Sequence, residues 1–288
     1  MEKFVFKNND PGGYSDLAAE RRRADLSVEG ISFRKDRAEF GFWERITVSG
    51  RKAEEAIGRP EGIYDTLNLP RMAHLDIDEI EDAANEVAKE LCRLCDRKSI
   101  IPERILVVGL GNQELTADSI GPKSADEVEA TLHILKEDRD LFYSLECSQI
   151  AVIKPGVKSA SGLDAHDVVH SISARLHPDL IIAIDSLAAR DPARIGTTVQ
   201  ICDTGIHPGS GIGNQRRGIS SETLGVPVIA IGVPTVINSR MFVVENGEAR
   251  ALKKEEGMFI APYEIGDLAK NAARIIGGGI NQAFGLGA

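Results

Sequence analysis

The sequence lacks the segments that would export a protein or hold it in a membrane. Its first 30 residues include the basic run 21–23 and no apolar stretch of the kind that a secretory signal needs. No segment reaches the roughly 18 uninterrupted apolar residues of a membrane span. We therefore expect a soluble, cytoplasmic protein that has no membrane partner.

Cysteine and positive charge are also scarce. Only four of the 288 residues are cysteine, which fits a reducing compartment better than a disulfide framework. The 34 Lys and Arg residues are outnumbered by 44 Asp and Glu residues, so the formal net charge is −10. This balance argues against direct binding to nucleic acid, because nucleic acids attract basic surfaces. With 42% apolar and 27% charged residues, the composition is that of a globular chain.

Continuous apolar runs from residue 105 onward are typical of strands buried on both faces. They span residues 105–110, 180–184 and 226–233. Helical patterns lie near residues 124–136, 164–177 and 220–224. This alternation predicts an α/β fold of three layers, in which helices cover both faces of a mostly parallel sheet.

The flanking regions carry other patterns. Apolar residues recur every three or four positions over residues 77–95, which predicts an amphipathic helix. A last helix is expected over residues 263–276, ended by three glycines at 277–279. Residues 31–70 alternate in short stretches and predict a small β subregion, while the polar, glycine-rich residues 1–30 predict a mobile arm.

Two aspartates stand where an α/β sheet usually binds its ligands. Sites in such folds form at the carboxyl ends of strands, and Asp118 and Asp185 follow the first and second apolar runs. Either residue alone could be a helix N-cap or a turn residue. Two neighbouring carboxylates can instead share a proton, so that one activates water and the other polarises a carbonyl group. The pair is therefore our candidate catalytic site.

The segment after residue 202 offers weaker candidates for substrate contact. Asp203 begins the triplet Asp-Thr-Gly of pepsin-like proteases, but those enzymes use two all-β lobes, and this sequence has one triplet in an α/β pattern. A glycine-rich loop follows it, and such a loop could contact an extended ligand. Its candidate residues are His207, Gly209 and Gly211.

Other motifs do not complete a known site. The turn at residues 109–114 lacks the third glycine of a dinucleotide fingerprint. The Cys-x-x-Cys pair at residues 92–95 has no second pair, and helix packing explains it better. His166 and His170 stand four apart on an expected helix, but a metal site would need a third ligand. We expect no metal and no cofactor.

Several segments together resemble the germination protease family, the endopeptidases of spore-forming bacteria. The most specific is residues 197–236, TTVQICDTGIHPGSGIGNQRRGISSETLGVPVIAIGVPTV. The others are residues 14–20 (YSDLAAE), 64–70 (YDTLNLP), 105–122 (ILVVGLGNQELTADSIGP), 180–190 (LIIAIDSLAAR) and 257–284. The resemblance covers almost the whole chain.

This resemblance implies an atypical aspartic endopeptidase whose α/β/α fold is similar to that of hydrogenase-maturation proteases. It implies that the enzyme degrades small acid-soluble spore proteins during germination in the spore core, and that it is made in the forespore as a self-processing zymogen. A homotetramer is also implied. The two active-site aspartates of the family correspond to Asp118 and Asp185.

The resemblance also implies a cleavage site near the N-terminus. Family substrates have an acidic residue, a bulky apolar residue, Ala, a small residue and a second acid, and they are cut after the first acid. Residues 16–20, DLAAE, repeat this pattern. A cut between Asp16 and Leu17 would release residues 1–16 as a propeptide and leave residues 17–288 as one peptidase domain. The alternative is that DLAAE simply begins a helix.

Two other functions stay open at this point. One is a metal-responsive maturation peptidase of the related fold, in which the acids at the strand ends recognise a metal in the substrate protein. Its missing element is a well-placed histidine, for which His207 is the loop candidate. The other is a binding module for spore proteins that has the family fold and no catalytic activity.

Overall fold

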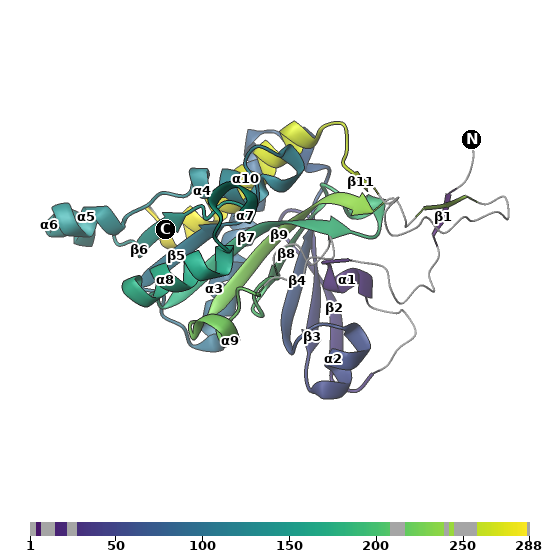
Figure 1. Ribbon diagram of the computed structural model, residues 1–288, viewed down its shortest axis with the longest axis horizontal. Coiled ribbons are helices and arrows are strands. Elements are labelled where there is room, and N and C mark those ends of the chain that lie inside the picture. Colours follow the sequence, from purple (N-terminus) through teal and green to yellow (C-terminus); the bar gives the residue numbers. More distant parts are fainter. Residues whose placement is uncertain are drawn as a thin grey trace.

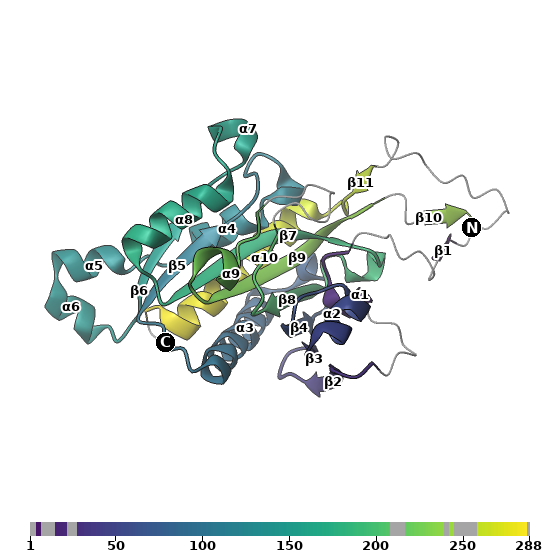
Figure 2. The same cartoon turned by 60° about the horizontal axis from the view of Figure 1, so that its bottom comes forward.

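The protein was analysed as a computed structural model, which describes residues 4–6, 15–21, 28–207, 217–238, 242–244 and 258–286. One large mixed sheet passes through the molecule, and a two-stranded antiparallel sheet joins β1 (Phe4–Phe6) to β10 (Phe242–Val244). Helices cover both faces of the large sheet (Figures 1 and 2). The predicted α/β class with three layers is confirmed. No helix in the described ranges is long and apolar enough to cross a membrane.

The large sheet has a parallel half and an antiparallel half. In the order of their pairing, the parallel strands are β6 (Gln149–Ile153), β5 (Arg104–Gly109), β7 (Leu180–Ala189) and β9 (Val228–Asn238). The antiparallel strands continue from β9 as β8 (Thr198–Cys202), β4 (Gly62–Asn68), β3 (Phe42–Val48) and β2 (Ile31–Arg37). The short strand β11 (Phe259–Ile260) also pairs with β9. The parallel arrangement predicted from the apolar runs therefore holds for the half that contains those runs.

One face of the sheet is covered by the long helices α3 (Ile77–Lys98) and α10 (Ile265–Phe284), together with α4 (Ile120–Glu127). The other face is covered by α1 (Ala18–Arg21), α2 (Arg51–Ile57), α8 (Ala165–Leu176) and α9 (Ser221–Leu224). Helices α5 (Leu132–Glu137) and α6 (Arg139–Ser144) project from one end of the molecule (Figure 1). Four short helices remain: α7 (Lys158–Ser161), η1 (Met72–His74), η2 (Thr116–Asp118) and η3 (Pro192–Arg194).

Helix α3 follows directly from its sequence. Asp76 accepts a hydrogen bond from the backbone N–H of Glu79, whose side chain accepts one from the backbone N–H of Asp76, so a capping box fixes the first turn. The helix ends at Ser99, which adopts a left-handed conformation with φ 55°. Its apolar stripe packs against the sheet and α10, which confirms the helix predicted from residue 77.

The three glycines at 277–279 do not end the last helix, contrary to the sequence expectation. Helix α10 continues to Phe284 because these positions are points of close approach. A Cβ atom at Gly277 would lie 2.4 Å from the Cβ of Glu127 in α4, and one at Gly279 would lie 2.7 Å from Val87 in α3. Tertiary packing therefore uses the small residues and outweighs their low helix propensity.

The helix expected over residues 124–136 is also interrupted. Val128 is extended, with φ −84° and ψ 130°, and separates α4 from α5. Thr131, which is fully buried, donates from its hydroxyl to the carbonyl of Ser148 and accepts a hydrogen bond from the N–H of Ile150. These bonds fix the connecting segment to the start of β6, so the chain turns where local periodicity alone predicts a continuous helix.

Candidate active site

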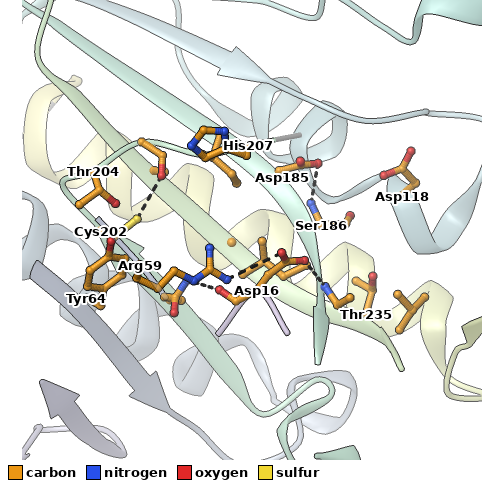
Figure 3. A pocket seen from close by; sticks show the side chains of 18 of the residues that line it. Asp16, Arg59, Tyr64, Asp118, Asp185, Ser186, Cys202, Thr204, His207 and Thr235 are labelled. Atoms are coloured by element: carbon orange, nitrogen blue, oxygen red, sulfur yellow. Dashed lines mark hydrogen bonds and ion pairs between the residues drawn. The ribbon is translucent and has the colours of Figure 1, made fainter. Parts of the chain in front are cut away.

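A pocket of about 180 Å³ opens where β7, β8 and β9 meet the N-terminal segment. The polar side chains that line it are Asp16, Arg59, Tyr64, Asp118, Asp185, Ser186, Gln200, Cys202, Thr204, His207 and Thr235 (Figure 3). The two candidate catalytic aspartates and the first residue of the predicted cleavage site therefore share one cavity. Residues far apart in the sequence, such as Asp16 and Thr235, meet here because β8, β9 and β7 are neighbours in the sheet.

Asp185 lies within β7, beside Gly232 of β9. Only 6% of its surface is exposed, and its Oδ1 accepts a hydrogen bond of 2.8 Å from the backbone N–H of Ser186. Strand β5 pairs with β7 only as far as Ile184, so Asp185 stands at the first position beyond that neighbour. Because the pairing with β5 stops at Ile184, the side chain of Asp185 in β7 can face the pocket.

Asp118 reaches the same pocket from η2, the short helix that follows the loop after β5. Its Oδ2 accepts a hydrogen bond of 3.0 Å from the N–H of Asn112, whose N–H also contacts the Asp118 carbonyl at 2.9 Å. Gly111 permits this loop: its φ is +112°, and a Cβ there would lie 2.2 Å from that carbonyl oxygen. The loop conformation therefore positions the carboxylate.

Two further hydrogen bonds fix η2 against the sheet. The hydroxyl of Thr235, a fully buried residue of β9, donates to the Ala117 carbonyl at 2.6 Å. The N–H of Ile120, at the start of α4, donates to the hydroxyl of Ser186 at 3.4 Å. Asp118 and Asp185 are thereby held by elements that contact each other directly, which suits a site that must keep two carboxylates in a fixed relation.

Asp16, the first residue of the predicted cleavage site, lines this pocket. The N–H of Asp16 donates to the Ala188 carbonyl at 2.9 Å, and its Oδ2 accepts from the N–H of Ala188 at 2.9 Å. Leu17 and Ala18 are fully buried, and helix α1 begins at Ala18. Residues 15–21 thus differ from the mobile arm expected from sequence, because the side chain of Leu17 fills an apolar site formed with Leu187 and Ala189.

The acid at the end of the DLAAE segment is held as firmly as the acid at its start. Glu20 accepts hydrogen bonds from the backbone N–H groups of Arg190 (2.7 Å) and Asp191 (2.8 Å), and the Ser15 hydroxyl also donates to it. Burial raises the pKa of Glu20 above its usual value, against the lowering effect of these donors and of Arg194. The segment is therefore anchored by side chains at both ends.

Sequence reasoning missed two polar residues that bind this segment. Arg59, just before β4, donates to the Ser15 carbonyl at 2.8 Å and lies 3.9 Å from Oδ1 of Asp16. Gln200, within β8, hydrogen-bonds the backbone on both sides of Leu17. The available signal for Gln200 is its position between the apolar residues Val199 and Ile201 of β8. A polar side chain inside a buried strand needs hydrogen-bond partners, and β8 itself contains no charged residue to provide them.

The remaining candidate residues of the loop after β8 do not all line the pocket. His207 lines the pocket. Asp203 is not among the lining residues: its Oδ1 accepts from the N–H of Ile63 at 2.7 Å and its Oδ2 lies 3.1 Å from Lys98, so it joins β4 to α3. Gly209 and Gly211 lie outside the described residues.

Thiol and metal chemistry find little support in the described ranges. Burial raises the pKa of Cys202, the thiol at the pocket, and such a thiol is a poor nucleophile. Burial also raises the pKa of Cys95 to about 12. His166 and His170 stack with ring centres 6.0 Å apart. Among the described residues, no group of three or more His, Cys, Asp or Glu side chains is arranged to hold a metal ion.

Comparison with known proteins gives consistent results over most of the chain. A family model described as germination protease matches residues 14–247. The chain is 35% identical to the germination protease of Caldanaerobacter subterraneus subsp. tengcongensis, over 94% of this chain and 93% of the relative. It is 31% identical to that of Clostridium perfringens, over 94% of each chain. A [NiFe] hydrogenase maturation protease from Thermococcus kodakarensis KOD1 is 17% identical, with a TM-score of 0.34 over 61% of this chain and 91% of that structure.

Proposed function

We propose, from the premise that this chain belongs to the germination protease family, that it is an endopeptidase of spore germination that uses Asp118 and Asp185 as its catalytic pair. The observation that carries this proposal is the shared pocket: both carboxylates line the cavity that also receives Asp16. The chain's own N-terminal segment thus borders the cavity in which we propose that a substrate peptide binds.

The chemistry assigned to the pair is general acid and base catalysis. The ionised carboxylate takes a proton from a water molecule, whose oxygen then bonds to the carbon of the peptide carbonyl. The protonated carboxyl group donates its proton to the leaving amine as the C–N bond breaks. Two acids that share a cavity suit these opposite roles, because the charge on one disfavours the charge on the other. No cofactor is needed for this hydrolysis.

The same pocket supports synthesis as a self-processing zymogen. We assign residues 1–16 to a propeptide and residues 17–288 to the mature peptidase domain. In the intact chain, Asp16 is bound to Ala188 and Leu17 is fully buried, so this segment excludes other peptides from the pocket. Cleavage between Asp16 and Leu17 would release residues 1–16, and the new N-terminus at Leu17 would then have to withdraw to open the pocket.

The proposed substrates are the small acid-soluble proteins of the spore, encountered in the spore core. Their implied cleavage pattern matches the chain's own DLAAE segment. The chain itself contacts both acids of that segment, through the N–H of Ala188 at Asp16 and through the N–H groups of Arg190 and Asp191 at Glu20. Donors at both positions favour a substrate with carboxylates at this spacing.

The decisive experiment is incubation of the purified chain with a small acid-soluble spore protein, followed by mass analysis of the fragments and N-terminal sequencing of the enzyme. We expect fragments cut after an acidic residue and a mature enzyme that begins at Leu17. Retention of activity after exhaustive chelation separates this function from a metal-responsive maturation peptidase. An intact substrate would favour a binding module without catalytic activity.

We also propose assembly as a homotetramer. The apolar residues Phe259, Ile260 and Tyr263 are exposed beside one another in the sequence, at 44%, 43% and 99% of their surfaces, and offer area for association. Light scattering that finds only a monomer at micromolar concentration would refute this assembly.

A further inference from the structure

We propose that the side-chain amide of Gln200 binds the carbonyl group of the peptide bond that is cut, first in the chain's own N-terminal segment and then in its substrates. The inference rests on the proposed self-cleavage between Asp16 and Leu17. It adds a third catalytic residue to the two aspartates, on a strand that contains neither of them.

The position of Gln200 in β8 determines where its side chain points. Its neighbours Val199 and Ile201 belong to the core that β8 shares with α3 and α10, so strand alternation turns Gln200 toward the opposite face and the pocket. Register places it beside Gly232 of β9, over which the side chain of Leu187 packs. The amide therefore extends directly into the cavity.

The amide makes one hydrogen bond on each side of Leu17. Its Nε2 donates to the Asp16 carbonyl at 3.1 Å, and its Oε1 accepts from the N–H of Ala18 at 2.8 Å. A backbone carbonyl can only accept and a backbone N–H can only donate, so these partners fix which end of the amide faces the Asp16 carbonyl. That carbonyl belongs to the bond predicted to be cut.

Other contacts hold the peptide on either side of this bond. Ala188 binds the N–H and the carboxylate of Asp16, and Arg59 binds the carbonyl of Ser15. Leu17 is locked by its apolar contacts with Leu187 and Ala189. Of these hydrogen bonds, the one from Gln200 is the contact that reaches the carbonyl of the bond itself.

Burial explains why the same amide would serve a second peptide. Gln200 is 7% exposed, and both of the side-chain hydrogen bonds that the described ranges provide for it end on residues 16–18. A buried amide that loses its hydrogen-bond partners is unfavourable, because its donor and its acceptor are both left unsatisfied. Once residues 1–16 are released and the new N-terminus withdraws from Gln200, an extended peptide that offers a carbonyl and an N–H at the same spacing restores both bonds.

The hydrogen bond from Gln200 to the Asp16 carbonyl is most important during the reaction, when the peptide bond is broken. As the oxygen of water bonds to the Asp16 carbon, the electron pair of the C=O double bond moves to the carbonyl oxygen, and one aspartate accepts the water proton. The Nε2–H group then faces a negatively charged oxygen. Collapse of this intermediate breaks the C–N bond, and the second aspartate protonates the new amine of Leu17. Loss of one such donor typically lowers the rate about 10²–10³-fold.

The test uses the full chain with three substitutions and measures the rate at which the Leu17 N-terminus appears. Gln200→Leu removes both hydrogen bonds. Gln200→Glu retains an acceptor for Ala18, but its ionised form has no donor for the Asp16 carbonyl. The control, Gln149→Leu, removes a glutamine of β6 whose side chain accepts a hydrogen bond from Arg104 of β5, away from the pocket. Circular dichroism and thermal unfolding establish which variants are folded.

We expect Gln200→Leu and Gln200→Glu to mature at least about 10²-fold more slowly than the parent at neutral pH, and the control to mature at the parent rate. The deficit of Gln200→Glu relative to the parent should shrink as pH falls and its carboxyl group gains a donating O–H. A merely structural role predicts no such recovery. With a peptide copy of residues 10–24 as substrate of the mature enzyme, the loss should fall on kcat rather than KM.

The possible failures are distinguishable. If Asp185→Asn matures like the parent, the proposed two-aspartate function is wrong and this inference fails with it. If Asp185→Asn is inactive while folded Gln200→Leu and Gln200→Glu mature at the parent rate, Gln200 has no part in the reaction. Faster maturation of both Gln200 variants would mean that the amide restrains the segment, which would also overturn the inference.

Discussion

Two pairs of acidic residues lie in different surroundings within this molecule. Asp118 and Asp185 line the pocket at the parallel half of the sheet. Asp65 of β4 and Glu90 of α3 lie under the antiparallel half, where only 1% of each side chain is exposed. The comparison shows that proximity of two carboxyl groups does not identify a catalytic site. What surrounds the groups decides their role.

Arginines neutralise the second pair. Arg45 of β3 contacts Asp65 at 2.9 Å and Glu90 at 2.6 Å, and Arg93 of α3 forms ion pairs with the same two acids. We call these four residues the buried ion cluster. It joins a strand pair to the helix that covers them and borders no described cavity, whereas the pocket pair faces space that a peptide enters. The surroundings of the cluster therefore suit a structural role, and those of the pocket suit the catalytic role that we propose for its acids.

The largest expected effect is at the pocket pair. Asp118→Asn and Asp185→Asn keep the shape of each side chain but remove its ionisable oxygen. Cleavage of substrate should fall about 10²–10⁴-fold in either variant, because each acid has a distinct proton to transfer. Their midpoints of urea unfolding should stay close to that of the parent. Near-normal cleavage by either variant would remove that residue from the catalytic site.

The buried ion cluster should respond in the opposite way. Arg45→Met leaves two buried acids with one arginine, and the free energy of unfolding should fall by about 3 kcal/mol. Specific activity per folded molecule should be unchanged. Urea denaturation gives the first quantity and a substrate assay the second. The matched control is Arg51→Met, which removes an exposed ion pair with Glu55 and should cost under about 1 kcal/mol. Equal losses in the two variants would contradict the distinction.

The stability that the buried ion cluster provides should also depend on pH. Burial, and then the neighbouring Glu90, raise the pKa of Asp65 from 3.8 to about 7. Between pH 4 and 7 the unfolded chain has therefore lost a proton that folded Asp65 retains. The stability from this group should fall as pH rises through that range and level off above it. Glu90 acts in the opposite sense: burial raises its pKa, but hydrogen bonds from Arg93, Asp65 and Arg45 outweigh burial and lower it.

Asp65→Asn isolates this effect. The free energy of unfolding of the parent minus that of the variant should decrease by about 2 kcal/mol between pH 4.5 and pH 7.5, a value reduced from the full shift because the pair is coupled. Urea titrations at several pH values measure the difference. Parallel curves for the two proteins would show that Asp65 does not hold a proton in this range.

The regular parts of this fold could be predicted because their signals are local. The apolar run at residues 180–184 became the first half of β7, and the apolar spacing from residue 77 onward became α3. The pocket acids followed from one general rule about strand ends, applied to Asp118 and Asp185. The expectation that Asp185 ends its own strand was wrong, because β7 continues to Ala189 and it is the pairing with β5 that stops at Ile184. These inferences need only a segment and its immediate neighbours in the sequence.

What sequence reasoning missed depends on contacts between distant segments. The bond between Ala18 and Gln200 joins residues 182 positions apart, and nothing in the local pattern indicates which strand receives the N-terminal segment. The buried ion cluster requires the pairing of β3 with β4 beneath α3, so its acids look like ordinary surface residues of amphipathic elements. At Gly277, local propensity predicts a helix end, and only the nearby surface of α4 explains the continuation.

The smallest expected effect concerns Glu20, which lies between the two extremes of the comparison. Like the acids of the buried ion cluster, Glu20 is fixed by contacts within the protein. Its donors, however, are the backbone N–H groups of Arg190 and Asp191 at the edge of the site. Glu20→Gln keeps the length of the side chain but removes the charge that strengthens both bonds, which is worth about 1–2 kcal/mol. Self-cleavage should slow about tenfold because Leu17 is held less firmly. The rate of appearance of the Leu17 N-terminus measures this, with the exposed acid change Glu29→Gln as control. A loss as large as that of Asp185→Asn would place Glu20 in the chemistry itself, and an unchanged rate would show that its contacts do not help to position the bond.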